Sequence, residues 1–234
     1  MRVGLAILNR NEEEALGQIL PMLPRDSVDL LFCVDGNSTD RSVQILAEHN
    51  IQIVAQQSPG RGEAFRIAFE FARDKVDALI LFSPDGNEDP SDIPRFRPIL
   101  EDGAVMVIAS RMMPGAFNEE DAHWFRPRKW ANLLFDWAAW LTWGRGQTRI
   151  TDMINGYRAI TVGLWDDLAP DGSGFTIEYQ VSIRAYKSRA RVVEFPTREG
   201  QRLGGKSQAK ALATGTRFLR LYWRELRRGR SSPP

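Results

Sequence analysis

The chain has 234 residues, of which 43% are hydrophobic and 26% charged, so it can bury a core and is neither fibrous nor disordered. A single cysteine, Cys33, excludes an internal disulfide, and with only two histidines a Cys/His zinc site is disfavoured. No signal-peptide pattern opens the chain, and no apolar run approaches the ~20 residues that cross a bilayer, which predicts a cytoplasmic protein.

The first half of the chain alternates short apolar runs with helical stretches. Strands are expected at residues 3–8, 30–34, 51–55 and 78–82, and helices from residue 11 onward, at 42–49 and at 63–73. Strands separated by such helices pair in parallel, with the crossovers packed on both faces of one sheet. The predicted fold class is therefore α/β, with a Rossmann-like, mostly parallel sheet and helices on both faces.

Polar clusters follow three of these strands, at the sheet edge where ligands bind in parallel α/β folds. They are residues 9–12 (Asn-Arg-Asn-Glu), 35–38 (Asp-Gly-Asn-Ser) and 83–87 (Ser-Pro-Asp-Gly-Asn). Their convergence favours a ligand site over three ordinary turns. No dinucleotide glycine fingerprint and no Walker-type phosphate loop follows the first strand, which argues against NAD enzymes and P-loop NTPases.

The segment 78–90 is the most informative part of the chain, because an apolar run ends abruptly in oxygen-bearing side chains. Asp85 and Asn87 can direct both side-chain oxygens to one hard cation, which then keeps waters and ligand phosphates as its other partners. This pattern predicts a nucleotide diphosphate ligand. Taken alone, the segment is also compatible with a turn, since Pro, Asp, Gly and Asn all favour turns.

A further strand at residues 105–111 brings Arg111 to the same edge, and residues 124–143 then hold five of the seven tryptophans. On a helix, Arg126, Arg128 and Lys129 lie at the amino end of an apolar stripe. The stripe comprises Trp130, Leu133, Leu134, Trp137 and Leu141. Two interpretations are open: a helix packed in the core, or a helix at a membrane interface, where tryptophan and flanking cations are favoured.

The C-terminal part of the chain is cationic. Residues 198–234 contain ten Lys and Arg against two Asp and Glu and carry +8, while the rest of the chain carries −7. Residues 209–228 predict a basic amphipathic helix, with arginines at spacings of three and four: Arg217, Arg220, Arg224 and Arg227. Its opposite side contains apolar residues: Leu212, Leu219, Tyr222, Trp223 and Leu226.

The apolar side of this helix either packs on the sheet domain or docks on a membrane surface, with nucleic acid the least favoured partner. The predicted division of the chain is a domain of residues 1–208, a basic amphipathic helix of residues 209–230 and a disordered tail of residues 231–234.

Seven motifs between Val3 and Gln208 resemble, in order, those of the family 2 glycosyltransferases of the GT-A fold. Among these they are most similar to the dolichol- and polyprenol-phosphate mannose or glucose synthases. The motifs are Asn11-Glu12-Glu13, residues 34–40, Gly60-Arg61-Gly62-Glu63-Ala64, residues 83–90, Ser110-Arg111, residues 152–158 and residues 202–207. No single motif is specific, but their order is.

Three positions depart from the family pattern. Arg61 replaces a lysine, and Gly36 replaces an aspartate, so Asp35 must serve the base or ribose alone or the nucleotide binds differently. Ser83 replaces the first aspartate of the metal motif, which removes a charged ligand and should weaken divalent-ion affinity. An inactive relative, or one with an altered metal preference, would be compatible with these departures.

The resemblance implies transfer of a sugar, with inversion, from a nucleotide diphosphate to a phosphate or hydroxyl acceptor. A cation and positioned arginines must take up the negative charge that builds on the departing diphosphate. Asp85 and Asn87 are the implied ligands of Mg²⁺ or Mn²⁺. The implied catalytic residues are Asp152, Arg111 and Arg202. The implied nucleotide-sugar-binding residues are Asn11, Glu13, Asp35, Asn37, Arg61, Asp85 and Lys206.

The acceptor decides whether a base is needed. A hydroxyl must lose a proton, for which Asp152 is the candidate, whereas a phosphate monoester is already anionic and needs orientation. Asp152 also has structural alternatives, as a turn cap or as a partner of Arg158. Glu178 suits a role in the site or on a helix surface equally well.

Polyprenyl phosphate is the expected acceptor, because a lipid would account for both amphipathic helices. The enzyme would then lie peripherally on the cytoplasmic face of an anionic membrane. The alternatives are a soluble family 2 transferase with a small or saccharide acceptor, and a non-catalytic nucleotide-sugar-binding relative. UDP and GDP remain open as the donor nucleotide, and no nucleic-acid partner is expected.

Overall fold

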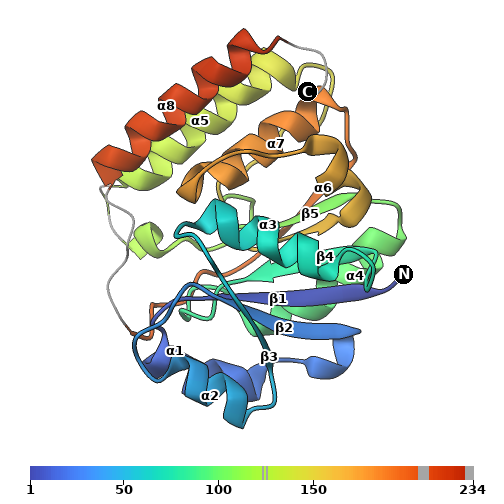
Figure 1. Ribbon diagram of the computed structural model, residues 1–234. Coiled ribbons are helices and arrows are strands. Elements are labelled where there is room, and N and C mark those ends of the chain that lie inside the picture. Colours follow the sequence, from blue (N-terminus) through green and yellow to red (C-terminus); the bar gives the residue numbers. More distant parts are fainter. Residues whose placement is uncertain (123, 125, 205–210, 230–234) are drawn as a thin grey trace.

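The structure is a computed structural model that describes residues 1–122, 124, 126–204 and 211–229. Within these residues its centre is one seven-stranded sheet of order β3-β2-β1-β4-β6-β5-β7 (Figure 1). The strands are β1 (Val3–Asn9), β2 (Leu30–Asp35), β3 (Gln52–Ala55), β4 (Ala78–Phe82), β5 (Met106–Ser110), β6 (Arg158–Thr161) and β7 (Val192–Pro196). The α-helices are α1 (Glu13–Ile19), α2 (Ser42–Glu48), α3 (Arg61–Ala72), α4 (Ile93–Glu101), α5 (Pro127–Trp143), α6 (Val162–Leu168), α7 (Ile177–Lys187) and α8 (Ala211–Arg227).

Neighbouring strands pair in parallel except at β6, which runs antiparallel to both β4 and β5. The predicted α/β fold with a mostly parallel sheet is therefore confirmed. The five expected strands all form, each within one residue of its expected bounds. Strands β6 and β7 and helices α4, α6 and α7 were not among the predicted elements.

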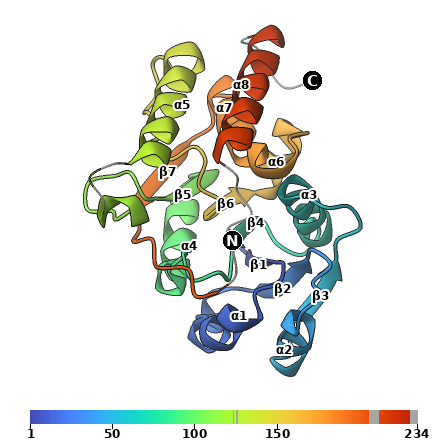
Figure 2. The same cartoon turned by 90° about the vertical axis from the view of Figure 1, so that its left-hand side faces the viewer.

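Helices cover both faces of the sheet, and each face has its own apolar core. On one face, α3, α6 and α7 pack together, and the rings of Phe69 and Trp165 stack with centroids 4.1 Å apart. On the other face, α1, α2 and α4 bury Leu16, Leu46 and Phe96 against the strands (Figures 1 and 2). Strands β1 and β4 are buried along their whole length, which explains why they read as continuous apolar runs.

The parallel strands β1, β2 and β4 end at the same edge of the sheet. The register pairs Asn9 with Asp35 across β1 and β2, and Ile7 with Phe82 across β1 and β4. The loops that follow these strands therefore begin side by side, and Figure 2 looks onto this edge.

Helices α5 and α8 lie side by side as an outer layer on α7 (Figure 1). The ring of Phe218 contacts those of Phe135 and Tyr179, at centroid distances of 5.4 and 5.6 Å. The hydroxyl groups of Thr142 and Tyr222 lie 2.6 Å apart. Within the described residues, none of the helices combines the length and the apolarity needed to cross a membrane.

A buried ion network fixes α8 on α7. Glu225, which is 1% exposed, accepts hydrogen bonds from Lys187 Nζ at 2.8 Å and from Arg184 Nη2 at 3.1 Å. Arg184 also pairs with Asp171, 3.0 Å away. Burial opposes ionisation of Glu225, but Lys187, Gln180 and Arg184 outweigh it and lower its pKa. Charges buried in this way are stable only while they remain paired.

We expect Glu225→Gln to lower the free energy of unfolding by about 3 kcal/mol, because two buried cations lose their shared counter-ion. Urea denaturation followed by tryptophan fluorescence measures this loss. The depressed pKa of Glu225 stabilises the fold above its unfolded-state pKa and ceases to do so as the pH falls through its lower folded-state pKa. Acidification should therefore destabilise the wild type more than the variant.

Arg220→Gln is the matched control, because Arg220 is exposed on the same helix. It should change the free energy of unfolding by less than about 0.5 kcal/mol. An equal effect of the two substitutions would show that the network does not anchor α8.

Candidate active site

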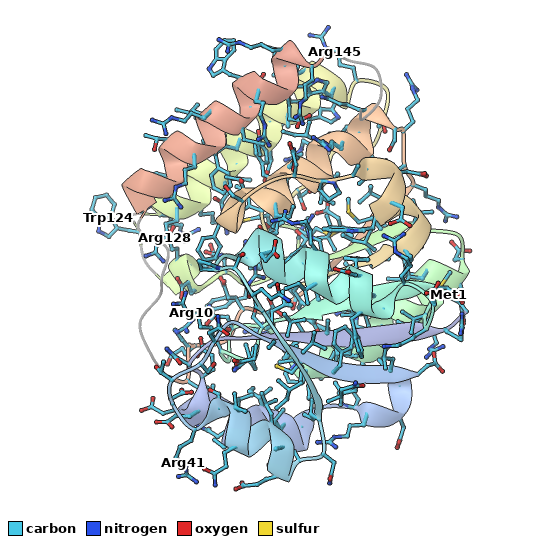
Figure 3. The ribbon with its side chains drawn as sticks, viewed as in Figure 1. Met1, Arg10, Arg41, Trp124, Arg128 and Arg145 are labelled. Atoms are coloured by element: carbon cyan, nitrogen blue, oxygen red, sulfur yellow. The ribbon has the colours of Figure 1, made fainter. Side chains whose placement is uncertain are left out.

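A cleft of about 570 Å³ opens at the carboxyl edge of the sheet. Its walls come from the loops after β1, β2, β4 and β5, from the start of α3, and from the amino-terminal parts of α5 and α7. Arg10 and Arg128, which Figure 3 labels, both line it. Its other charged lining residues are Glu12, Arg61, Asp85, Glu88, Arg111, Glu119, Glu120, Lys129, Glu178, Glu199, Arg202 and Arg217.

The loops after β1 and β2 are tied together by side-chain hydrogen bonds. Asn9 Nδ2 donates to Asp35 Oδ1 at 2.8 Å, and Asp35 Oδ2 accepts from the Ser38 amide at 2.9 Å. Asn9 Oδ1 is buried without a hydrogen-bond partner among the described residues. Asp35 therefore lies at the carboxyl end of β2, oriented by Asn9 and Ser38, and is not among the residues that line the cleft.

Three other residues expected to bind the nucleotide-sugar shape this corner without lining the cleft. Asn11 Oδ1 accepts from the Thr39 amide at 2.8 Å, and Glu13 Oε2 accepts from the Arg41 amide at 2.9 Å. Asn37 has a φ of 59°, a left-handed conformation that asparagine tolerates in turns. Lys206, another expected ligand, lies outside the described residues.

Asp85 and Glu12 share one cation, the guanidinium of Arg202. Arg202 Nη1 lies 2.7 Å from Asp85 Oδ2, and Nη2 pairs with Glu12. Burial raises the pKa of Glu12 to about 7, although Arg202 opposes the shift. Glu12 Oε2 and Asn87 Oδ1 are buried and have no hydrogen-bond partner among the described residues.

The loop that carries Arg202 lies directly on the loop after β4. The Leu203 amide donates to Asp85 O, and the Gly200 amide donates to Asn87 O, both at 2.9 Å. Gly86 has a φ of 91°, and a Cβ there would lie 3.0 Å from the Gln201 carbonyl oxygen. Only glycine fits this crossing, so Gly86 allows the two loops to meet.

Arg61 connects α3 to α7 and to the end of β4. Its Nε pairs with Glu178, and its Nη1 donates to Ser83 Oγ at 3.0 Å. Burial raises the pKa of Glu88 to about 8, with Arg61 opposing the shift. A Cβ at Gly156 would overlap the guanidinium, so this glycine provides the space that Arg61 occupies.

Arg111 is held by two carboxylates on different elements. Its Nε and Nη2 donate to the two oxygens of Asp152 at 2.8 and 3.0 Å, and Nη1 donates to Glu199 Oε1 at 2.9 Å. Asp152 is fully buried and is not part of the cleft lining. Burial opposes its ionisation, but Arg111 prevails and lowers its pKa. Arg158, the suggested alternative partner of Asp152, instead donates to backbone carbonyls and to Ser182.

The geometry of Asp152 suits a residue that orients Arg111. A general base must reach the proton that it removes, whereas both Asp152 oxygens are engaged behind the guanidinium.

Some site residues were not assigned from the sequence. Glu12 and Glu88 lie inside recognised motifs and line the cleft. Their raised pKa values result from burial, which the sequence does not show. Glu199 and Asn118 meet through a hydrogen bond of 2.7 Å that spans 81 positions in the chain, and no local pattern indicates it.

Within the described part of the chain, no three His, Cys, Asp or Glu side chains form a ready metal cluster. The candidate cation ligands are the side-chain oxygens of Asp85, Glu12 and Asn87. Arg202 already neutralises part of the negative charge of Asp85. The cleft combines carboxylates, amide oxygens and three arginines held in ion pairs, Arg61, Arg111 and Arg202. This arrangement fits a polyanionic ligand together with a hard cation.

The chain is similar to known glycosyltransferases. An uncharacterised glycosyltransferase of Mycobacterium tuberculosis is 28% identical over 92% of this chain and 93% of its own. An undecaprenyl-phosphate mannosyltransferase of Micrococcus luteus is 27% identical over 97% of this chain and 98% of its own. Glucosyl-3-phosphoglycerate synthase of Mycobacterium tuberculosis has a similar fold, with a TM-score of 0.71 and 16% identity over 99% of this chain and 80% of that chain.

The sequence model of glycosyl transferase family 2 matches residues 6–158. This segment runs from the second half of β1 through β5 and contains the loops that form most of the cleft, including the site around Asp85. The chain therefore belongs to glycosyl transferase family 2.

Proposed function

We propose that this enzyme transfers a sugar, with inversion, from a UDP- or GDP-sugar to polyprenyl phosphate or a related lipid phosphate. The observation that carries the proposal is the oxygen set of Asp85, Asn87 and Glu12 beside Arg202. Such a set can hold a cation and a diphosphate together. The undecaprenyl-phosphate mannosyltransferase supports the lipid acceptor, since it resembles this chain over nearly its whole length.

The residues present fit Mg²⁺ or Mn²⁺. Glu12 Oε2 and Asn87 Oδ1 are buried oxygens without a partner among the described residues, and Asp85 adds a carboxylate. Hard divalent cations prefer such oxygen ligands. When bound, the metal would supply positive charge to the departing diphosphate. The solved structure of glucosyl-3-phosphoglycerate synthase contains Mn²⁺ and UDP-glucose.

Arg202 occupies the place of a cation among these oxygens. Its guanidinium neutralises Asp85 and Glu12. With a metal held by these carboxylates, Arg202 would be free to pair with the donor diphosphate, since arginine binds phosphate oxygens well. Arg202 would thus neutralise the acids before binding and the leaving group afterwards.

Arg111 is the group proposed to meet the acceptor phosphate. It lines the cleft and is held by Asp152 and Glu199, so its orientation is fixed before the acceptor arrives. A phosphate monoester is already anionic near neutral pH and needs no general base. This agrees with the position of Asp152 behind Arg111.

A small phosphorylated acceptor is the second candidate. Solved structures of the similar glucosyl-3-phosphoglycerate synthase contain phosphoglyceric acid. An acceptor of this kind would use the same arginines and would need no membrane.

The first experiment is a donor survey. Purified protein with Mn²⁺ or Mg²⁺ is incubated with UDP- and GDP-sugars, with and without a short-chain polyprenyl phosphate, and released nucleotide diphosphate is assayed. We expect one donor to be turned over, with stimulation by the lipid phosphate and a loss of about 100-fold or more in Asp85→Ala. Stimulation by phosphoglyceric acid alone would favour the small acceptor, and donor binding without turnover would indicate a non-catalytic relative.

Arg202→Gln should have opposite effects on the two ligands. Without the competing guanidinium, Mn²⁺ should bind several-fold more tightly in the absence of nucleotide, measured from the free Mn²⁺ signal in electron paramagnetic resonance. The nucleotide diphosphate should bind about tenfold more weakly, because one charge-assisted contact is lost. Arg10→Gln, a change at another cleft arginine, should leave Mn²⁺ affinity unchanged. Weaker Mn²⁺ binding in Arg202→Gln would contradict the proposal that Arg202 and the metal compete for Asp85 and Glu12.

Asp152→Asn tests whether this carboxylate orients Arg111 or removes a proton. If it orients Arg111, KM for the acceptor should rise about tenfold, while kcat and its pH profile change little. Loss of a general base would instead lower kcat by about 10²-fold to 10⁴-fold and remove a limb of the pH profile. Circular dichroism checks that the variant folds, and Glu199→Gln, which releases the guanidinium on its other side, should resemble Asp152→Asn.

A further inference from the structure

Helices α5 and α8 each expose a stripe of large apolar side chains. On α5, Trp130, Leu134, Trp137 and Leu141 follow one another at helical spacing and are 46% to 69% exposed. On α8, Leu219, Trp223 and Leu226 are 37% to 55% exposed. Together these seven residues are called the α5–α8 surface. The side chain of Leu212, expected on the same stripe, is not described.

The two stripes lie on the same outer side of the helix pair. On α5, Ala139 and Trp143 are buried, and the stripe lies on the opposite face by helical spacing. On α8, Phe218 and Leu221 are buried, and Tyr222 meets α5 through Thr142. The exposed stripe of α8 is next to Tyr222 around the helix, on the side that faces away from the buried Phe218 and Leu221. Because the helices lie side by side (Figure 1), the two stripes border each other.

The exposed charged residues of the two helices have one sign, and two of them pair with acids of neighbouring segments, Arg224 with Asp171 and Arg128 with Glu119. The acidic residues of the two helices are Asp136 and Glu225, and both are buried. The exposed charged residues are basic, with Arg220, Arg224 and Arg227 on α8 and Arg128 on α5. The surface is therefore apolar with a cationic border, which complements a bilayer containing anionic lipids.

We propose that the α5–α8 surface docks on an anionic bilayer. Tryptophans favour the headgroup boundary, and arginines beside them favour anionic lipid. A second copy of the chain is a poorer occupant, because two-fold pairing would bring the same cationic helices together.

Docking would bring the cleft to the headgroups. Arg128 and Lys129 at the start of α5, and Arg217 on α8, line the cleft as well as belonging to the two docking helices. Trp124, 90% exposed just before α5, projects from the same edge as Arg10 and Arg128 (Figure 3). A lipid phosphate would thus enter the cleft beside basic residues. This orientation rests on the proposed lipid acceptor, whereas docking itself can be measured without any substrate.

The test is co-sedimentation of the full chain with phosphatidylcholine vesicles that contain about one third phosphatidylglycerol, at low salt. The wild type should sediment with these vesicles and remain in solution with pure phosphatidylcholine. Trp223→Glu combined with Leu226→Glu should weaken binding at least tenfold. Arg220→Gln combined with Arg227→Gln should weaken it roughly 25-fold, since each arginine near the surface contributes about a factor of five.

Met22→Glu is the matched control, because Met22 is exposed and apolar but lies just after α1, away from the α5–α8 surface. It should bind vesicles like the wild type, and all variants should keep wild-type nucleotide affinity and circular dichroism. The proposal is overturned if the wild type stays in solution, if Met22→Glu loses as much binding as the surface variants, or if the surface substitutions only convert a dimer into monomers. Vesicle binding without turnover of any lipid phosphate would leave docking intact and reject the acceptor.

Discussion

The cleft depends on the pairing of half-buried arginines with carboxylates from distant parts of the chain. Arg61 joins α3 to α7 through Glu178, and Arg111 joins the end of β5 to Asp152 and Glu199. Arg202 joins its own loop to Asp85 and Glu12. Buried charges are costly unless paired, so these contacts fix the cleft walls relative to each other. Burial raises the pKa values of Glu12 and Glu88, and a cation bound beside either carboxyl would favour its ionised form.

The structure gives a physical account of two departures from the family motifs. Ser83 accepts a hydrogen bond from Arg61, and its amide donates to Glu88 at 2.6 Å, so the loop after β4 keeps a nearby carboxyl without an aspartate at this position. A Cβ at Gly36 would lie 3.3 Å from Cβ and Cδ of Arg10. Glycine at position 36 thus allows the arginine stem to lie across the end of β2. Both departures occur where an arginine side chain lies against the altered residue, Arg61 at Ser83 and Arg10 at Gly36.

The sequence could predict what is decided locally. Strands β1, β2 and β4 are apolar because they are buried, and their carboxyl-end loops contain recognisable turn and ligand residues. Strand β6 has only two apolar residues, Ala159 and Ile160, and its Arg158 is fully buried among backbone carbonyls. No local pattern predicts such a strand, because its stability comes from tertiary hydrogen bonds. The orientation of Asp152 could likewise not be predicted from the sequence, since its partner Arg111 lies 41 positions earlier.

The outer helices and the cleft are parts of one packed structure, linked by the segment before α7. Asp171 pairs with Arg184 of α7 and with Arg224 of α8. The next residue, Gly172, accepts from Arg66 of α3 at 3.2 Å, and Gly174 and Phe175 line the cleft. Paired charges and a short stretch of backbone therefore connect α8 to the cleft wall. Because these contacts are already formed, a membrane-docked α8 would present the cleft to lipid headgroups without first rearranging the sheet.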